Sequence, residues 1–221
     1  MERDELTEFL EAARKFGLHG DNEMFHLMAF TGMRPGEVCV LKEKDFDFEN
    51  NTVRISKTMY NPDNNMKKYK LETPKTDASI RTPDVDETIM TLLKSFIRKA
   101  SKVRLAVKNF DPDYHDEKFI FCNDHGYPVI QKTIIRRMNR LLRKTSIKKE
   151  ATPHIFRHTH ISMLAEADVD LKTIMKRVGH DDPKTTLAVY THVTERMKKG
   201  AADKVKVQFS DILSKVALQE M

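Results

Sequence analysis

The spacing of apolar residues changes its period along the chain, and this change limits the fold more than any other feature. From Arg3 to Phe16, and again from Asp86 to about Lys108, apolar residues recur every three or four positions, as in a helix that buries one face. Between about Asp45 and Pro83 the pattern alternates in short segments such as Val53-Arg54-Ile55, which is the period of a half-buried strand. Helical spacing returns after residue 129. The pattern predicts an α+β fold, mostly α-helical, with one small antiparallel β-sheet.

Residues with restricted backbone geometry mark where several helices begin and end. Pro35 suits the first turn of a short helix. Thr152-Pro153 and Asp182-Pro183 each predict a helix start, with the first residue as cap and proline at the first helical position. Gly179 is expected to end the preceding helix, because glycine adopts the left-handed conformation of a helix C-terminus without strain. A basic helix is expected from Val129 to about Thr145.

Length and composition exclude several classes of protein. The 221 residues suffice for one large domain or two small ones. No segment reaches the ~20 apolar residues that a membrane helix needs, and the charged N-terminal segment does not resemble a signal peptide. Cys39 and Cys122 are too few for a disulfide framework or a four-thiolate zinc site. We therefore expect a cytoplasmic protein with no membrane partner.

Charge is distributed unevenly and favours a polyanionic partner. The 39 lysines and arginines exceed the 33 acidic residues, which gives a formal net charge of +6. A solvated helix face would ordinarily mix both signs, so a segment with basic residues alone favours nucleic acid. Residues 131–149 form such a segment, with no acidic residue and eight basic ones: Lys132, Arg136, Arg137, Arg140, Arg143, Lys144, Lys148 and Lys149. The first six are the predicted DNA contacts.

Separated motifs contain residues suited to phosphate chemistry. Arg34 lies within Thr31-Gly32-Met33-Arg34-Pro35-Gly36-Glu37, and His154 and Arg157 are one helical turn apart on a common face. His180 follows a glycine, and Tyr190 comes ten residues later. Over nearly the whole chain these motifs resemble the tyrosine recombinase (phage integrase) family. The order is that of the family: an arginine in G-x-R-x-G-E, a lysine in the sheet, H-x-x-R, G-H and a tyrosine.

The resemblance implies the catalytic-domain fold of that family and the activity of a site-specific DNA recombinase or integrase. Such an enzyme integrates or excises a mobile element, and it cleaves and rejoins DNA through a 3′-phosphotyrosyl intermediate without metal, ATP or another cofactor. Tyr190 is then the nucleophile. Arg34 and Arg157 clamp the phosphate through paired hydrogen bonds that lysine cannot copy. His154 and His180 donate hydrogen bonds to the phosphate or assist proton transfer from Tyr190.

The resemblance also implies a lysine on a β-hairpin turn that acts as general acid for the departing 5′-oxygen. Lys75 matches the family's K-T-x-x-S-x-R turn, within Thr73-Pro74-Lys75-Thr76-Asp77-Ala78-Ser79-Ile80-Arg81. Lys67, Lys68 and Lys70 on the preceding strand are alternatives for this role, or else phosphate contacts or a solvated edge.

Domain organisation and assembly follow from the same resemblance. Residues 1–221 are expected to form a single catalytic domain without the separate N-terminal core-binding domain of family members. The expected partner is double-stranded DNA, on which four copies pair two sites, whereas the free protein is a monomer or dimer. Residues 203–221 form a C-terminal tail with an apolar stripe that includes Phe209, Ile212 and Leu213. This tail is expected to dock in trans on a neighbouring subunit in the active assembly and in cis when the protein is free; a terminal helix that stays folded on its own domain is the alternative.

Two other functional classes remain open at the level of sequence. His154, His158 and His160 could be imagined as ligands in a metal-dependent nuclease, although no acidic partner accompanies them in the motif. A DNA-binding regulator, by contrast, would need the basic helix but not Tyr190. Activity on a nicked DNA substrate separates the regulator from an enzyme.

Overall fold

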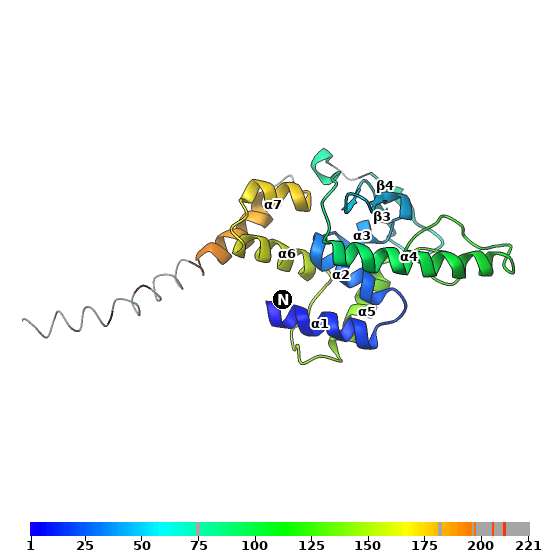
Figure 1. The fold of residues 1–221 in the computed structure, drawn as a ribbon, viewed down its shortest axis with the longest axis horizontal. Coiled ribbons are helices and arrows are strands. Elements are labelled where there is room, and N and C mark those ends of the chain that lie inside the picture. The colour runs from blue at the N-terminus through cyan, green and yellow to red at the C-terminus, as the bar shows by residue number, and fades with distance from the viewer. Residues whose placement is uncertain (74–75, 181–182, 196, 198–204, 206–209, 211–221) are drawn as a thin grey trace, which may run out of the picture.

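A computed structural model describes residues 1–73, 76–180, 183–195, 197, 205 and 210 (Figure 1). Over these residues the protein is mostly helical with a small antiparallel β region, which confirms the predicted fold class. The helices are α1 (Arg3–Phe16), α2 (Asp21–Thr31), α3 (Pro35–Val38), α4 (Glu87–Lys108), α5 (Gln131–Leu142), α6 (His154–Glu166) and α7 (Leu171–Val178). The strands are β1 (Phe46–Asp47), β2 (Thr52–Val53), β3 (Thr58–Tyr60) and β4 (Lys70–Glu72).

Three helix ends confirm the sequence predictions. α3 begins with Pro35, and α4 begins directly after Asp86, whose side chain accepts a hydrogen bond from the backbone N–H of Thr88. Gly179 ends α7 in the left-handed conformation, with φ of 70°. The last of these ends matters for function, because it places His180 immediately beyond a sharply terminated helix.

The expected side-chain cap at Thr152 is wrong. Pro153 already has helical dihedral angles, and no side-chain hydrogen bond caps the N-terminus of α6. Thr152 instead contributes its backbone carbonyl, which accepts from the N–H of Ile155. Residues 183–195 are helical, whereas the predicted cap of that segment, Asp182, lies outside the described residues.

The β region contains two two-stranded antiparallel sheets rather than one continuous sheet. β1 pairs with β2, and β3 pairs with β4 in a register that places Met59 opposite Leu71. Met59 of β3 is buried, whereas all three residues of β4 are exposed, so β4 lacks the buried apolar face that would hold a further strand. An isolated antiparallel bridge between Ile55 and Arg81 brings the segment after the hairpin back to the core.

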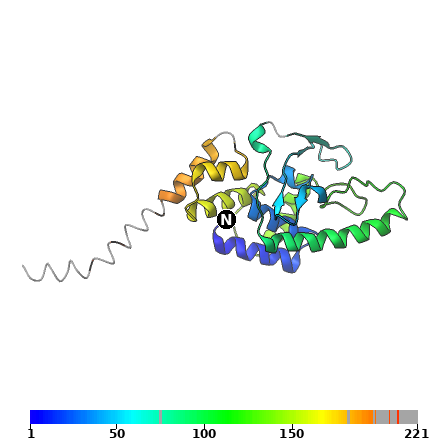
Figure 2. The ribbon, with the colours of Figure 1, turned by 45° about the horizontal axis from the view of Figure 1, so that its top comes forward.

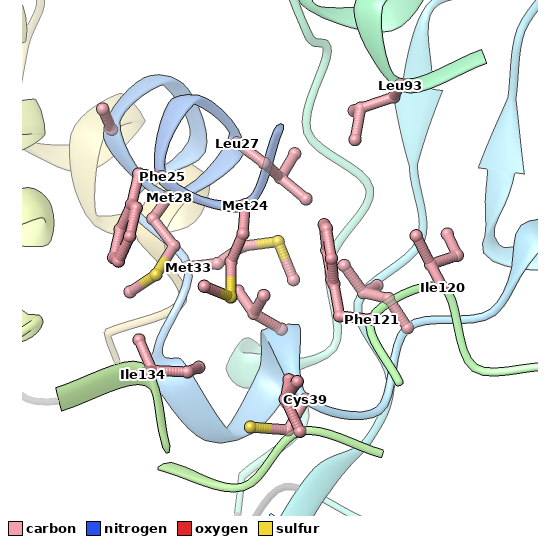
Figure 3. Close-up of a cluster of buried hydrophobic side chains, with 14 of the residues drawn as sticks. Met24, Phe25, Leu27, Met28, Met33, Cys39, Leu93, Ile120, Phe121 and Ile134 are labelled. Atoms are coloured by element: carbon pink, nitrogen blue, oxygen red, sulfur yellow. The ribbon is translucent and has the colours of Figure 1, made fainter. Parts of the chain in front are cut away.

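α2 lies at the centre of the main core and contacts α1, α4 and α6. Its side chains Met24, Leu27 and Met28 are fully buried, and Figure 3 shows them gathered near Met33 and Phe121. Burying a side chain of this size contributes roughly 1.5–3 kcal/mol relative to leaving it exposed. The packing of α2 therefore fixes the turn that follows it, which carries the first motif arginine.

A second, smaller apolar cluster supports the other side of the motif region. It buries Ile161 and Ala165 of α6, Ile174 and Val178 of α7, and Val193 of the last described helical segment. In Figures 1 and 2, α6 and α7 lie together at one end of the molecule, while the long helix α4 extends toward the other end. The second cluster thus holds α7 and the last helical segment on α6, which itself contacts α2.

Candidate active site

Arg34 lies just before α3, and acceptors from two parts of the chain orient its guanidinium. Nη1 donates to Oε1 of Glu37 at 3.0 Å, and Nη2 donates to the backbone carbonyl of Gly179 at 3.1 Å. Glu37 Oε2 also accepts from the Arg34 backbone N–H at 2.8 Å. The Arg34 side chain remains 33% exposed, whereas that of Glu37 is 2% exposed. Arg34 is therefore held in place while part of it stays open to a ligand.

Arg157 projects from α6 and is only 4% exposed. Its Nε donates to Nε2 of His180 at 3.0 Å, and its Nη1 donates to the backbone carbonyl of Gly32 at 2.8 Å. Nη2 is buried and has no hydrogen-bond partner among the described residues. Burial lowers the pKa of the Arg157 guanidinium to about 9, and the charges of Arg34 and Arg81 act in the same direction. A buried cation with an unpaired donor is suited to binding an anion.

Gly32 is required by the close approach of α2 to α6 and α7. It ends α2 in the left-handed conformation, with φ of 63°. A Cβ atom at this position would lie 3.0 Å from Cδ2 of His160 and 3.3 Å from Cγ1 of Val178. The glycine thus lets the carbonyl that binds Arg157 reach its donor.

His180 uses both of its ring nitrogens. Nε2 accepts from Arg157, so the proton of the neutral ring lies on Nδ1, which donates to Oγ1 of Thr186 at 2.5 Å. Burial, followed by the nearby charges of Arg157 and Arg34, lowers the pKa of His180 to about 4. At neutral pH the ring is uncharged and orients Arg157. Its predicted donation to a phosphate is not tested by this arrangement.

His154 and Tyr190 lie on the two helices that flank α7. His154 is exposed in the first turn of α6, and its pKa is lowered by partial burial of the ring and then by the charge of Arg157. Tyr190 lies in the helical segment 183–195, and its half-buried side chain packs on the second apolar cluster. Within the described part of the chain, no hydrogen bond joins the Tyr190 hydroxyl to Arg34 or Arg157. The nucleophile remains a prediction.

Lys75, the predicted general acid, lies outside the described residues. The alternatives Lys67, Lys68 and Lys70 are all exposed on or beside the β3–β4 hairpin. The ammonium of Lys67 lies 5.6 Å from the centroid of the Tyr127 ring, which gives this lysine a cation–π contact within the protein.

The predicted DNA contacts on and after α5 fall into two groups. Arg137 and Arg140 donate to Asp21 of α2 at 2.9 and 3.2 Å, and the Asp21 side chain is fully buried. They also donate to the backbone carbonyls of His19 and Phe16, respectively. These two arginines therefore hold α5 on α2. The other four side chains are exposed: Lys132, Arg136, Arg143 and Lys144.

Sequence reasoning missed the contact between Arg81 and Glu37. Both terminal nitrogens of Arg81 donate to the Glu37 carboxylate, at 3.0 and 2.9 Å. The Nε of Arg81 donates to the backbone carbonyl of Arg177 at 3.0 Å. A signal existed, because Arg81 and Glu37 each end a motif that the sequence already singled out. Thr186, the partner of His180, carried no comparable signal.

The described residues contain no group of three or more His, Cys, Asp and Glu side chains that could hold a metal ion. The three histidines considered as ligands do not share one environment: His154 and His158 are exposed, whereas His160 is buried and bonded to the Ala29 carbonyl. Over the same residues, no helix combines the length and the apolar character needed to cross a bilayer.

Comparison with known proteins places this site in a family context. The Phage integrase family matches residues 1–197. The chain is 39% identical over 180 residues to the integrase of Staphylococcus phage L54a, covering 81% of this chain and 50% of that protein. It is 37% identical over 180 residues to the prophage ps2 probable integrase of Lactococcus lactis subsp. lactis strain IL1403, covering 80% and 46%, respectively. The chain thus spans about half the length of the curated relatives it matches.

A solved structure of the Tn1549 transposon integrase, in complex with circular intermediate DNA, has the same fold. The match has a TM-score of 0.70 and 22% sequence identity, and it covers 93% of this chain and 66% of that chain. All of the motif residues from Arg34 to Tyr190 lie within the segment that the family matches. The chain described here belongs to the phage integrase family.

Proposed function

We propose that this protein is a site-specific DNA recombinase that cleaves and rejoins strands through a 3′-phosphotyrosyl intermediate, in the integration or excision of a mobile element. The observation that supports this proposal most strongly is that Arg34 and Arg157 bind adjacent residues. Arg34 donates to the Gly179 carbonyl, and Arg157 donates to the His180 ring. Two guanidiniums from distant parts of the chain are thereby brought to one point. The relatives named as phage and transposon integrases support the same assignment.

The charge of this site favours a phosphodiester. Arg157 has no carboxylate partner among the described residues, and its buried Nη2 is unpaired. Arg34 keeps a third of its side chain exposed. Paired guanidiniums in a water-poor site stabilise the charge that develops on the non-bridging oxygens during phosphoryl transfer. Their binding to a scissile phosphate would occupy the donors that the protein leaves open.

Tyr190 is the nucleophile in this proposal. A phenol has a reference pKa of about 10, so it needs help in losing its proton, which nearby cations provide. Thr186 and Tyr190 are four residues apart in one helical segment, and therefore lie on one face of it. The bond from His180 to Thr186 ties that face to Arg157. This tie supports delivery of the tyrosine to the phosphate that the arginines bind.

Strand cleavage and rejoining by this route need no cofactor. The Tyr190 hydroxyl passes its proton to the neutral ring of His154 or to water, and its oxygen attacks phosphorus. The bond from phosphorus to the 5′-oxygen breaks, and Lys75 supplies the proton to the leaving oxygen. The phosphotyrosyl ester retains the free energy of the broken phosphodiester bond. The 5′-hydroxyl of a second strand can therefore attack the phosphorus, form a new phosphodiester bond and release the tyrosine.

We further propose that four copies act on two duplexes, that residues 1–221 are one catalytic domain, and that residues 203–221 dock on a neighbouring subunit.

Covalent capture from a randomised library tests this function and identifies a substrate. Nicked duplexes with a random core are incubated with the protein in EDTA, and DNA that stays attached under denaturing conditions is sequenced. We expect capture at a preferred sequence, with attachment to a 3′-phosphate and none for Tyr190→Phe. Cleavage that requires added Mg²⁺ or Zn²⁺ would favour the nuclease, and sequence-specific binding without any adduct would favour the regulator.

A further inference from the structure

Arg81 connects three segments that build the proposed phosphate site. Its Nη1 and Nη2 donate to Oε1 and Oε2 of Glu37 in α3, and its Nε donates to the carbonyl of Arg177 at the end of α7. Its backbone pairs in both directions with Ile55. The side chain is therefore fixed between the first motif, the helix before His180, and the segment that follows the hairpin.

Glu37 is shared by two arginines, and this sharing determines how much positive charge the site retains. Each carboxylate oxygen accepts one hydrogen bond from Arg81 and one from Arg34. Burial alone would raise the pKa of Glu37, but the contacts with Arg81 and Arg34 outweigh it, so the pKa lies below its usual value. Glu37 is thus a buried anion. If it faced Arg34 alone, it would cancel the charge that a phosphate needs.

The end of α7 also packs closely on Arg81. A Cβ atom on Gly179 would lie 2.9 Å from Nη1 of Arg81 and 3.1 Å from the carbonyl oxygen of Ala78. The carbonyl of Gly179 binds Arg34, and the next residue, His180, binds Arg157. Arg81 therefore sets the position of both anchors while it compensates the nearby carboxylate.

We propose that Arg81 is a positioning residue for the phosphate clamp: it neutralises Glu37 while bound to the end of α7, and so leaves the charge of Arg34 available to the scissile phosphate. This inference rests on the proposed function. If Arg81 only linked α7 to the segment after the hairpin, any other side chain that makes such a link would matter equally for cleavage. Arg177 offers that comparison, because it binds Asp84 at 2.6 Å and His160 at 3.2 Å but does not contact Glu37.

Three variants separate charge compensation from simple packing. Arg81→Gln removes the charge and keeps an amide donor, Arg81→Lys keeps the charge, and Arg177→Gln is the matched control. Each is assayed for thermal stability, for equilibrium DNA binding and for the single-turnover rate of covalent capture, on the duplex that the wild-type protein selects. We expect Arg81→Gln to capture DNA on the order of 10²-fold more slowly, with affinity within about threefold. Arg177→Gln should stay within about fivefold of the wild-type rate. Arg81→Lys keeps the charge but lacks the fork that reaches Glu37 and the Arg177 carbonyl together, so its rate should fall between those of the wild-type protein and Arg81→Gln.

Two results would overturn the proposal: capture by Arg81→Gln as fast as by Arg177→Gln, or capture by Arg81→Lys as slow as by Arg81→Gln. If the glutamine variant does not fold, Arg81→Lys decides alone, and capture on the order of 10²-fold slower than wild type contradicts the proposal, because the charge is then kept without effect. Failure of the proposed function has a different signature, because the wild-type protein then forms no adduct through Tyr190, and the inference falls with it.

Discussion

The Nε of Arg157 donates to Nε2 of His180 at 3.0 Å, and this contact fixes the protonation state of the histidine. In a doubly protonated ring the Nε2–H would face the Nε–H of Arg157, and the two would repel. The ring therefore carries a single proton on Nδ1, which donates a hydrogen bond to Oγ1 of Thr186. Thr186 precedes Tyr190 by four residues on the same helical segment. Arginine, histidine and the tyrosine-bearing helix are therefore linked through one chain of contacts.

Removing either guanidinium should strongly slow cleavage. We expect Arg34→Ala and Arg157→Ala each to lower the single-turnover rate at least ~100-fold, because charge-assisted hydrogen bonds to the transition state are lost. Arg157→Lys should remain impaired, since an ammonium lacks the planar fork that reaches Gly32 and His180 together. Arg98→Ala, on the exposed side of α4, is the control. Normal cleavage by both alanine variants would place the clamp elsewhere.

The buried His160 should make folding stability depend on pH. Burial, followed by the charge of Arg177, lowers the pKa of His160 to about 4. Because an unfolded histidine has a pKa near 6.5, the unfolded chain takes up a proton that the folded protein excludes. The stabilisation is thus complete above about pH 6.5 and is lost as pH falls toward 4, by roughly 3 kcal/mol.

Urea unfolding of wild-type protein and His160→Gln at several pH values measures this effect. The variant should be less stable at pH 7.5, because the bonds to Ala29 and Arg177 are altered, but its stability should fall less steeply below pH 6.5. Parallel curves for the two proteins over pH 4–7 would show that His160 does not carry the dependence.

Much of the fold could be predicted from periodicity, because a helix or strand with one buried face leaves a regular apolar pattern. The helix that begins after Asp86 is an example, while the end of α7 was predicted from the backbone freedom of Gly179. The division of the β region into two short sheets could not be predicted, since strand partners depend on contacts distant in sequence. The bridge between Ile55 and Arg81 is such a contact.

The motifs indicated which residues meet, but not how their charges are balanced. The resemblance to the family implied that Arg34, Arg157 and His180 belong to one site, and the structure brings these three together. Glu37 and Arg81 each end a motif, but they are 44 positions apart, so no local pattern shows that the arginine compensates the carboxylate. The binding of Arg137 to the buried Asp21 was likewise hidden, because a basic helix looks the same whether its arginines face DNA or a carboxylate.

The two groups of basic residues should respond differently to substitution. For the wild-type protein, about five neutralised phosphates correspond to a log–log salt slope near −4.5. Arg136→Ala should reduce the magnitude of this slope by about 0.9 without loss of stability. Arg137→Ala should instead lower the free energy of unfolding by roughly 2 kcal/mol, because the buried Asp21 loses a partner, and should leave the slope unchanged. DNA-binding titrations at several salt concentrations, with unfolding curves, separate the two groups. A wild-type slope near zero would contradict the assignment of the exposed group to DNA, and unchanged stability of Arg137→Ala would contradict the role of Arg137 in holding α5 on α2.

The general acid can be identified by chemical rescue. Lys75→Ala should slow cleavage because the 5′-oxygen then leaves without a proton. Sulfur at the same bridging position is a better leaving group, so a 5′-phosphorothiolate substrate should restore the rate of this variant. Lys70→Ala on the exposed strand β4 is the matched control and should need no rescue. If only the Lys70 variant is rescued, the acid lies on β4.

The central claim is that Tyr190 attacks a phosphate held by Arg34 and Arg157, and its most direct test is the mass of the trapped peptide. The wild-type protein and Tyr190→Phe are each incubated in EDTA with a nicked duplex from the selected pool, then denatured and digested with protease and nuclease. The account predicts a nucleotide linked through its 3′-phosphate to the peptide that contains Tyr190, and no adduct for Tyr190→Phe, whose DNA affinity stays within about threefold. An adduct on another residue, or an adduct that persists in Tyr190→Phe, would contradict it.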